Sequence, residues 1–250
     1  MNHAKAIGRF GMLAVGLGIG SAVAATPGIA SADATAVDAA AFDPTPLIAD
    51  AVSAASGLNL AISIDGHSLI ADGTASAYSG TDDIAIAYGN DATAEAGYGN
   101  SPGTGDYAFA DGAGSYANTG IGNDDSATAV GSGSAAVAGT GNGDTAYADG
   151  TDTSATAGGT YFPGTPNTLD IASNDSYASA IGDNDTAYAG TEIDGVSATT
   201  TTTGDIATII GNSSDAYAGV GSYDFAGVLG EMLTATATGA SNMFDFMPAL

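Results

Sequence analysis

The stretch Asp125-Ser-Ala-Thr-Ala-Val-Gly131 carries the pattern that decides the fold: an Asp, alternating residues with Ala at every second place, and a closing Gly. Close copies occupy residues 83–89, 106–112 and 144–150. Looser copies start at the aspartates Asp170, Asp185, Asp205 and Asp224. Repetition of this kind is typical of arrays and solenoids, in which each unit packs only on its neighbours.

The spacing of the copies indicates two strands per repeat. Asp106, Asp125 and Asp144 follow one another at intervals of 19 residues, and a weaker alternating segment such as Ser134-Ala-Ala-Val-Ala138 lies between them. We call the repeated motif Asp-x-Ala-x-Ala-x-Gly the phrase. Antiparallel hairpins suit the turn residues, but copies of the phrase that stack in register form a parallel ladder. We therefore predict an all-β fold, a β-solenoid or β-roll of two short strands per ~19-residue coil with atypical terminal caps.

The copies also assign faces to the strands. The second and fourth places after the Asp are Ala, whereas the first, third and fifth vary from Ile and Tyr to Ser, Thr and Asp. A packed interior tolerates little change in volume, and a surface tolerates much. We therefore expect the Ala columns to face inward, with the two sheets closer than the usual ~10 Å.

Residues outside the phrases set the predicted domain organisation. A basic start, an uncharged apolar stretch and the small-x-small site Ala30-Ser-Ala32 indicate a secretory signal peptide, with a retained N-terminal anchor as the alternative. The run Leu58-Asn-Leu-Ala-Ile-Ser-Ile64 has large apolar residues at period two, which predicts a cap strand. The expected order is a signal peptide at 1–32, a flexible leader at 33–57, a cap strand at 58–67, the repeat array at 68–239 with a proline-containing loop at 158–169, and a C-terminal cap or tail at 240–250.

Charge limits the partners that this protein can take. The chain has a net charge of −26, and its two cations, Lys5 and Arg9, both lie in the predicted signal peptide. A mature chain from Asp33 would carry 28 acids, no Lys or Arg, and one histidine, His67. Such a charge repels nucleic acid and anionic membrane surfaces. The chain has no Cys, so it contains no disulfide even though the signal directs it to an oxidising compartment.

Two families resemble parts of the sequence. The N-terminus Met1-Asn-His-Ala-Lys-Ala-Ile-Gly-Arg-Phe-Gly-Met12, followed by acidic Gly/Ala repeats, resembles secreted or envelope-associated repeat proteins of mycobacteria, a group that implies no known activity. The segments Ser126-Ala-Thr-Ala-Val-Gly131 and Ser179-Ala-Ile-Gly182 resemble the head repeats of trimeric autotransporter adhesins. That second resemblance implies a left-handed parallel β-roll, trimers and binding to a host surface, although the period of this chain is longer.

Two runs of sequence raise the question of calcium. Gly103-Thr-Gly-Asp106 and Gly141-Asn-Gly-Asp144 partly resemble the Gly-Gly-x-Gly-x-Asp nonapeptides of calcium-binding β-rolls. Here, however, the Asp follows the last Gly directly and returns after about 19 residues rather than nine. Aspartates that cap turns explain the same runs. Calcium therefore stays an alternative, and we assign no metal-binding or cofactor-binding residue.

Catalysis has little support in the sequence. The predicted mature chain has neither Cys nor Lys, and its single imidazole lies in Asp65-Gly-His67-Ser68. A Ser/His/Asp unit requires groups that converge in space, and neighbours on one exposed turn seldom do so. We expect no enzymatic activity and assign no catalytic residue.

A binding surface for a partner would have to use the outward positions, because these are the positions that vary between copies. Five aromatic residues occupy outward places and would form a strip if they stacked on successive coils: Tyr107, Phe109, Tyr147, Tyr188 and Tyr217. Such a strip binds a protein or glycan, or only strengthens the sheet. The segment Met243-Phe-Asp-Phe-Met247 would cap the last coil or seat in a membrane or partner groove.

These patterns together favour a secreted or cell-envelope structural or interaction repeat protein without catalytic activity. Two alternatives are a calcium-stabilised β-roll and an adhesin-like module that binds a host or glycan partner. A disordered chain is a third, because few large apolar residues are present to drive folding.

Overall fold

The computed structural model describes residues 58–97, 103–159, 173–190, 192–193, 196–197, 202–238 and 243–248. The chain divides into two compact units, Met1–Ser56 and Gly57–Leu250, and every described residue lies in the second unit. The predicted signal peptide and leader, and most of the predicted loop at 158–169, therefore lie outside the described residues.

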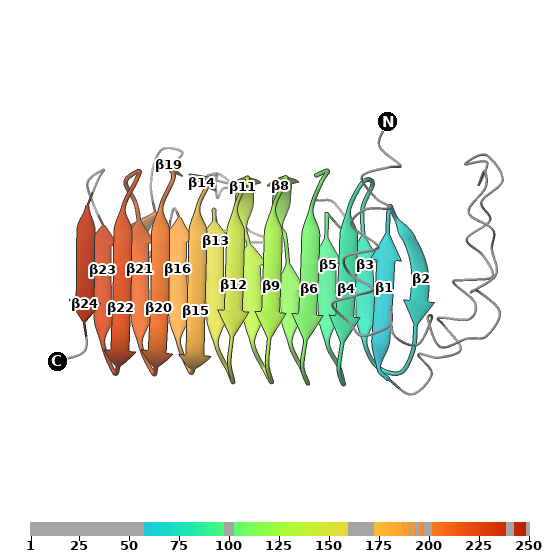
Figure 1. The fold of residues 1–250 in the computed structure, drawn as a ribbon. Helices are drawn as coiled ribbons and strands as arrows, with labels where there is room; N and C mark the ends of the chain where they lie inside the picture. Colours follow the sequence, from blue (N-terminus) through green and yellow to red (C-terminus); the bar gives the residue numbers. More distant parts are fainter. Residues whose placement is uncertain are drawn as a thin grey trace, which may run out of the picture. The chain divides into compact units, whose positions relative to one another are not determined.

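The described part of the chain is all-β and contains no helix (Figure 1). The larger sheet has ten strands in the order β2 (His67–Ala71), β1 (Leu60–Ile64), β4 (Ile84–Tyr88), β6 (Tyr107–Asp111), β9 (Ser126–Val130), β12 (Thr145–Asp149), β15 (Tyr177–Asp183), β20 (Ile206–Asn212), β22 (Phe225–Glu231) and β24 (Phe244–Pro248). The smaller sheet has eight strands in the order β23 (Thr234–Thr238), β21 (Asp215–Gly219), β16 (Thr186–Gly190), β13 (Ser154–Gly158), β10 (Ala135–Ala138), β7 (Tyr116–Asn118), β5 (Thr93–Ala96) and β3 (Ser76–Ser79). Three short pairs complete the described strands: β8 (Ile121–Asn123) with β11 (Thr140–Asn142), β14 (Ser173–Asn174) with β19 (Thr202–Thr203), and β17 (Glu192–Ile193) with β18 (Val196–Ser197).

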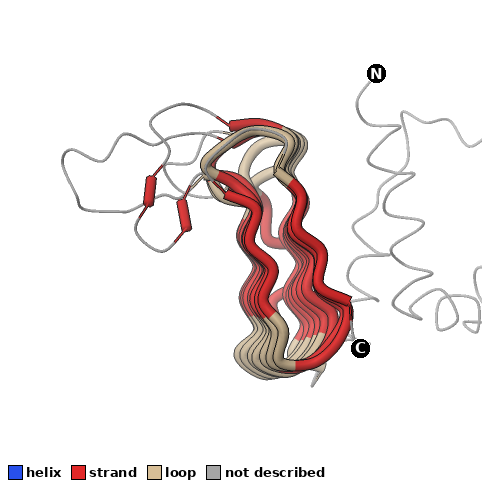
Figure 2. Tube along the Cα trace, turned by 90° about the vertical axis from the view of Figure 1, so that its left-hand side faces the viewer, coloured by secondary structure: helices blue, strands red, loops and turns tan. Residues whose placement is uncertain are grey.

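The chain passes back and forth between the two long sheets. From β4 to β7, and again from β20 to β24, consecutive strands alternate between the larger and the smaller sheet. From β4 onward in the larger sheet, and throughout the smaller sheet, neighbours are parallel and in register, so that Ala127 of β9 pairs with Ala108 of β6 and with Ala146 of β12. Seen along the array, successive strands of each sheet overlie one another (Figure 2). The phrases thus stack as the parallel ladder predicted from their repetition.

The register corrects two of the predicted looser copies. The place after Asp144 in the larger sheet belongs to Ser176, which precedes β15, and not to the predicted opener Asp170, which lies outside the described residues. Asp185 precedes β16 and so opens a strand of the smaller sheet. Longer insertions interrupt the 19-residue period here, so sequence spacing alone does not show that the copy opened by Asp185 lies in the smaller sheet.

The core consists almost entirely of alanine, as predicted. The second and fourth places of the phrase strands are fully buried, including Ala108, Ala127 and Ala129. Alternate residues of a strand point to opposite faces, so these methyl groups face the other sheet. Towards the C-terminal end, Ile209 and Val228 take the fourth place and are also buried. Leu60, Ile62 and Ile86 are buried at the N-terminal end as well, so larger buried side chains occur near both ends of the larger sheet.

Glycines at the end of the phrase allow the turns to stack closely. Gly131 has a φ of 107°, and a Cβ at this position would overlap the carbonyl oxygen of Gly150 in the next repeat. Gly150, with a φ of 148°, meets Gly182 in the same way. Other residues rarely adopt this backbone conformation, so the closing Gly of the phrase is required by both conformation and space.

The two ends of the array differ. At the N-terminal end, β1 is antiparallel to both β2 and β4, so a hairpin closes the larger sheet. At the C-terminal end, β24 is parallel to β22 and is the last strand of the larger sheet. The Asp245 carboxylate of β24 accepts a hydrogen bond from the backbone N–H of Thr236 in β23 at 2.7 Å. This bond links the last strands of the two sheets.

Candidate functional site

A column of buried aspartates runs through the array before β4, β6, β9, β12, β20 and β22 of the larger sheet, and Ser176 takes the corresponding place before β15. We call these aspartates the Asp column: Asp83, Asp106, Asp125, Asp144, Asp205 and Asp224, each at most 1 % exposed. In each, Oδ1 accepts a backbone N–H from the corresponding place of the next repeat. Asp106 donates to Asp83 at 2.9 Å, and Asp125 donates to Asp106 at 3.0 Å. Each aspartate of the column therefore caps the following repeat.

The second carboxyl oxygen of each residue in the Asp column is buried without a hydrogen-bond partner in the described part of the chain. Burial away from water raises the pKa of Asp125 to about 8 and that of Asp144 to about 7, because the charged form loses its hydration. The same desolvation raises the pKa of Asp83, Asp106 and Asp205 to about 6. The chain has no Lys or Arg beyond residue 9 to compensate these charges. The interior of the column therefore favours neutral carboxylic acids.

The calcium-like runs place their aspartates in this column. Asp106 and Asp144 belong to different repeats, and each commits Oδ1 to a backbone N–H, from Asp125 and Ser176 respectively. Calcium takes six to eight oxygen ligands around one point. Among the described residues, no three His, Cys, Asp or Glu side chains are placed to hold a metal ion together. The column places at most one carboxyl group in each repeat and does not bring several around one point, so its aspartates link successive repeats.

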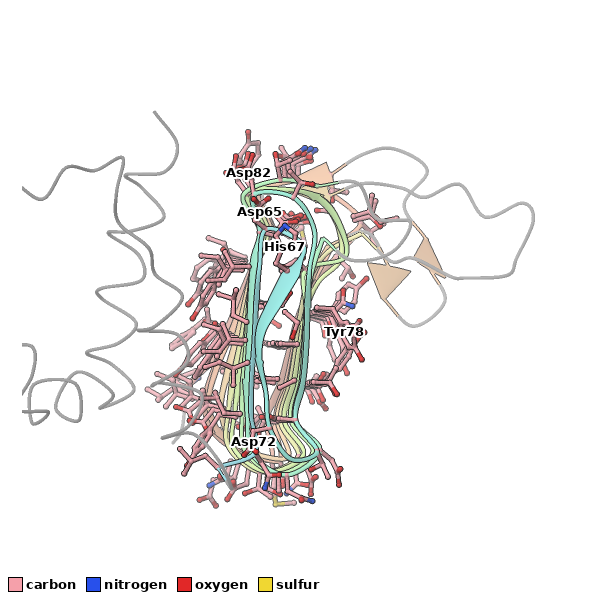
Figure 3. All side chains as sticks on the ribbon, turned by 90° about the vertical axis from the view of Figure 1, so that its right-hand side faces the viewer. Asp65, His67, Asp72, Tyr78 and Asp82 are labelled. Carbon is pink, nitrogen blue, oxygen red and sulfur yellow. The ribbon has the colours of Figure 1, made fainter. Side chains whose placement is uncertain are left out.

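The single histidine outside the predicted signal peptide lies on the surface at the N-terminal end. His67 is exposed at the start of β2 and pairs with Ile64 of β1. Figure 3 views this end of the array and shows Asp65, His67 and Asp82 at one edge of the stack. Asp65 accepts a hydrogen bond from the backbone N–H of Asp82 at 3.0 Å. The Asp65 carboxylate, two residues before His67, thus supports a neighbouring turn.

The five predicted outward aromatics do not form one strip. Tyr107, Phe109 and Tyr147 lie on β6 and β12 of the larger sheet, whereas Tyr188 and Tyr217 lie on β16 and β21 of the smaller sheet. Tyr188 pairs directly with Tyr217. Thr128 separates Phe109 from Tyr147 in their column. The sequence placed these residues correctly on outward positions, but the two sheets face opposite directions.

A polar cluster occupies the outer face of the smaller sheet. The Tyr116 hydroxyl donates to Glu95 Oε2 at 2.9 Å, and Asn118 Nδ2 donates to the same oxygen at 2.6 Å. Burial, followed by the nearby Glu95 charge, raises the pKa of Tyr116 to about 12. At one corner, Asn123, Asn142 and Asn174 form a side-chain ladder from Nδ2 to Oδ1 at 2.8 and 3.1 Å. In both places the polar side chains hydrogen-bond to one another across neighbouring strands, which strengthens the stack of repeats.

An open cavity of about 230 Å³ lies at the N-terminal end. Residues of β1, β2 and β3 line it, among them Ala61, Ile70 and Ala77. Its buried hydroxyls, Ser63 and Ser79, hydrogen-bond to each other at 2.8 Å. The lining therefore combines small apolar groups with hydroxyls, of which Ser63 and Ser79 bond to each other.

The outer face of the larger sheet turns apolar over its last four strands. We call these outward residues of β15, β20, β22 and β24 the apolar face: Tyr177, Ile181, Ile206, Ile210, Phe225, Leu229, Phe244 and Phe246. Seven of them are between 37 % and 72 % exposed, the exception being the half-buried Phe225. The rings of Phe225 and Phe244 stack with centroids 4.9 Å apart.

The apolar face was missed from the sequence, although a signal for it exists. In the fifth place of the phrase, Asp111, Val130 and Asp149 give way to Ile181, Ile210 and Leu229. An alignment of the internal copies in the register of the structure displays this change. The longer insertions before β15 and β20 hid that register.

Comparison of the chain with models of protein families, with curated proteins and with solved structures found no match. In the part of the chain that the structure describes, no helix has the length and apolarity needed to span a membrane.

Proposed function

We propose that this chain is a secreted or cell-envelope repeat protein that acts as a structural or interaction surface and has no catalytic activity. Its finer fold would be a β-solenoid in which each coil contributes one strand to each long sheet. The observation that carries the proposal is the register: Ala pairs with Ala across β6, β9 and β12, while the outward residues change at every step. The Ala positions that all three copies share pack inside the stack, and the positions that vary between copies face solvent.

The chemistry of the described residues supports a passive role. The titratable groups with raised pKa values are the buried Asp column, the buried Asp185 of the smaller sheet, and outward groups such as Tyr116, which is engaged by Glu95 and Asn118. No catalytic set is suggested by their placement, since the aspartates occupy successive repeats and face backbone N–H groups. A net charge of −26 argues against nucleic acid and anionic membrane surfaces as partners.

Cell fractionation tests the location. A C-terminally tagged full chain, expressed in its own organism, should appear in the envelope or medium with a mature N-terminus at Asp33. Retention in the cytosol with an intact N-terminus would contradict the proposal. A cytosolic marker protein in the same fractions controls for lysis.

Small-angle X-ray scattering on the mature chain tests the solenoid. Ten stacked strands at ~4.8 Å each predict a stiff section of roughly 45 Å. A globular profile, or that of an expanded coil, would refute the finer fold.

A further inference from the structure

The apolar face differs in composition from the outer face of the smaller sheet. Across the eight-stranded sheet, outward places hold mainly Ser, Thr and Tyr, such as Ser154, Thr186 and Thr234. Across β15 to β24 the first and fifth places hold mainly Ile, Leu, Phe and Tyr in two columns, and the third-place column between them holds Ser179, Thr208, Gly227 and Phe246. One column reads Tyr177, Ile206, Phe225 and Phe244, and the other reads Ile181, Ile210, Leu229 and Pro248. Both columns therefore continue without a charge over four strands.

The area of this face is large for a monomer. Seven side chains with the exposures given above, at roughly 200 Å² for each fully exposed residue, leave about 650 Å² in contact with water. The largest apolar patch on a typical monomer is about 300–600 Å². Two such faces in contact would bury about 1,300 Å² in total, which reaches the lower range of specific protein interfaces.

The face is also suited to pack against a copy of itself. It is flat, because it lies on one sheet, and its ridges have the spacing of the strands, ~4.8 Å. Two sheets pack face to face when their ridges interdigitate at about 10 Å with a small crossing angle. A second copy has ridges of the same spacing by construction, and a two-fold axis makes the contact self-complementary.

Charge around the face predicts how association depends on salt. Acids lie at its border, including Asp149 before Ile181 in the fifth-place column and Glu231 at the end of β22. No cation exists beyond residue 9 to pair with the acids of a second copy. Like charges at the rim repel, and this repulsion is screened at higher ionic strength.

We propose that the apolar face is a contact between two copies of this chain, packed sheet against sheet around a two-fold axis. This inference rests on the proposed function, since a passive surface acts through what it contacts. The dimer is weak, with a dissociation constant of roughly 10–100 µM, because the area lies near the lower limit for a specific interface.

Sedimentation equilibrium of the full chain tests the inference. We expect a monomer–dimer equilibrium that tightens at least threefold when sodium chloride is raised from about 0.05 to about 0.5 M. A chain that stays monomeric up to about 0.5 mM overturns the proposal. Dimerisation that weakens with salt also overturns it, because it would require attraction between opposite charges.

Two variants at Ile210, 57 % exposed near the centre of the face, locate the interface. Ile210→Asp should raise the dissociation constant more than tenfold, and Ile210→Thr, which keeps a β-branched residue, should raise it severalfold. Thr156→Asp adds the same charge to the outer face of β13 in the smaller sheet and should leave dimerisation unchanged. Equal dimerisation by the wild-type chain and Ile210→Thr, with native circular dichroism, overturns the assignment.

The outcome is separable from the test of location. A monomer found in the envelope overturns only the dimer, whereas a dimer found in the cytosol overturns only the proposed location. The fractionation and the sedimentation experiments therefore test the two proposals independently.

Discussion

Replacing Asp125 by Asn tests the buried Asp column directly. Asn keeps the oxygen that accepts the Asp144 N–H at 2.9 Å, and it replaces the unpartnered Oδ2 by a group that never ionises. Burial raises the pKa of Asp125 from 3.8 to about 8. The folded state therefore holds a proton on Asp125 over a range in which the unfolded chain has lost it.

The sign and size of the effect follow from this difference. Because the folded-state pKa is raised, the wild-type free energy of unfolding falls as pH rises from about 4 through about 8. At 1.36 kcal/mol per pKa unit, the difference is worth roughly 6 kcal/mol at most, and relaxation around the charge lowers it to about 2–4 kcal/mol. Asn lacks this term, so Asp125→Asn should stabilise the fold by that amount near pH 9. Near pH 4 the two chains should differ by less than about 1 kcal/mol, since neutral Asp and Asn both carry an unpartnered polar group.

Urea unfolding followed by circular dichroism at several pH values measures these differences. Asp124→Asn is the matched control, because Asp124 is the exposed neighbour of Asp125 in the same turn. The control should show the wild-type dependence on pH. An Asp125→Asn chain that is less stable than wild type near pH 9, or that retains the full wild-type pH dependence, would refute the description of the column as neutral acids.

Three further substitutions test the core, the turns and the polar cluster. Ala127→Leu should overpack the narrow interior and lower the free energy of unfolding by about 1–3 kcal/mol, measured by urea unfolding. Gly131→Ala should destabilise by more than about 2 kcal/mol in the same assay, because a Cβ overlaps the Gly150 carbonyl and the φ of 107° is strained. Tyr116→Phe removes the hydroxyl bonded to Glu95 and should cost about 1 kcal/mol. In a spectrophotometric titration, it should also remove the phenol that ionises near pH 12.

Matched controls lie in the same strands and turns. Thr128→Leu changes an outward residue of the same strand as Ala127 and should alter stability by less than about 0.5 kcal/mol. Gly114→Ala has open space around its new Cβ and should cost less than Gly131→Ala. Tyr223→Phe removes an exposed phenol and should lower the free energy of unfolding by less than Tyr116→Phe does. Equal effects in a pair would show that the contact named for that pair is unimportant.

The fold class and the orientation of the strands were predictable because both depend on local pattern. A period of two assigns residues to faces, and Ala at alternate places among variable neighbours identifies the inner face. Ala127 and Ala146 are accordingly buried. The place of Asp185 was not predictable, because insertions after Asp144 break the period, and only strand pairing shows which sheet receives each segment.

The sequence by itself determined a parallel stack with small residues inside and an acidic, variable exterior, since these follow from repetition, side-chain volume and charge. Only the tertiary structure decided what the aspartates and aromatics do. Asp125 is buried because the next repeat lies above it and presents the Asp144 N–H, a contact between residues 19 apart. The apolar face exists because Tyr177, Ile206 and Phe225 come into one column across intervals of 29 and 19 residues. Pairing between repeats sets both features, and no local pattern encodes the length of an insertion.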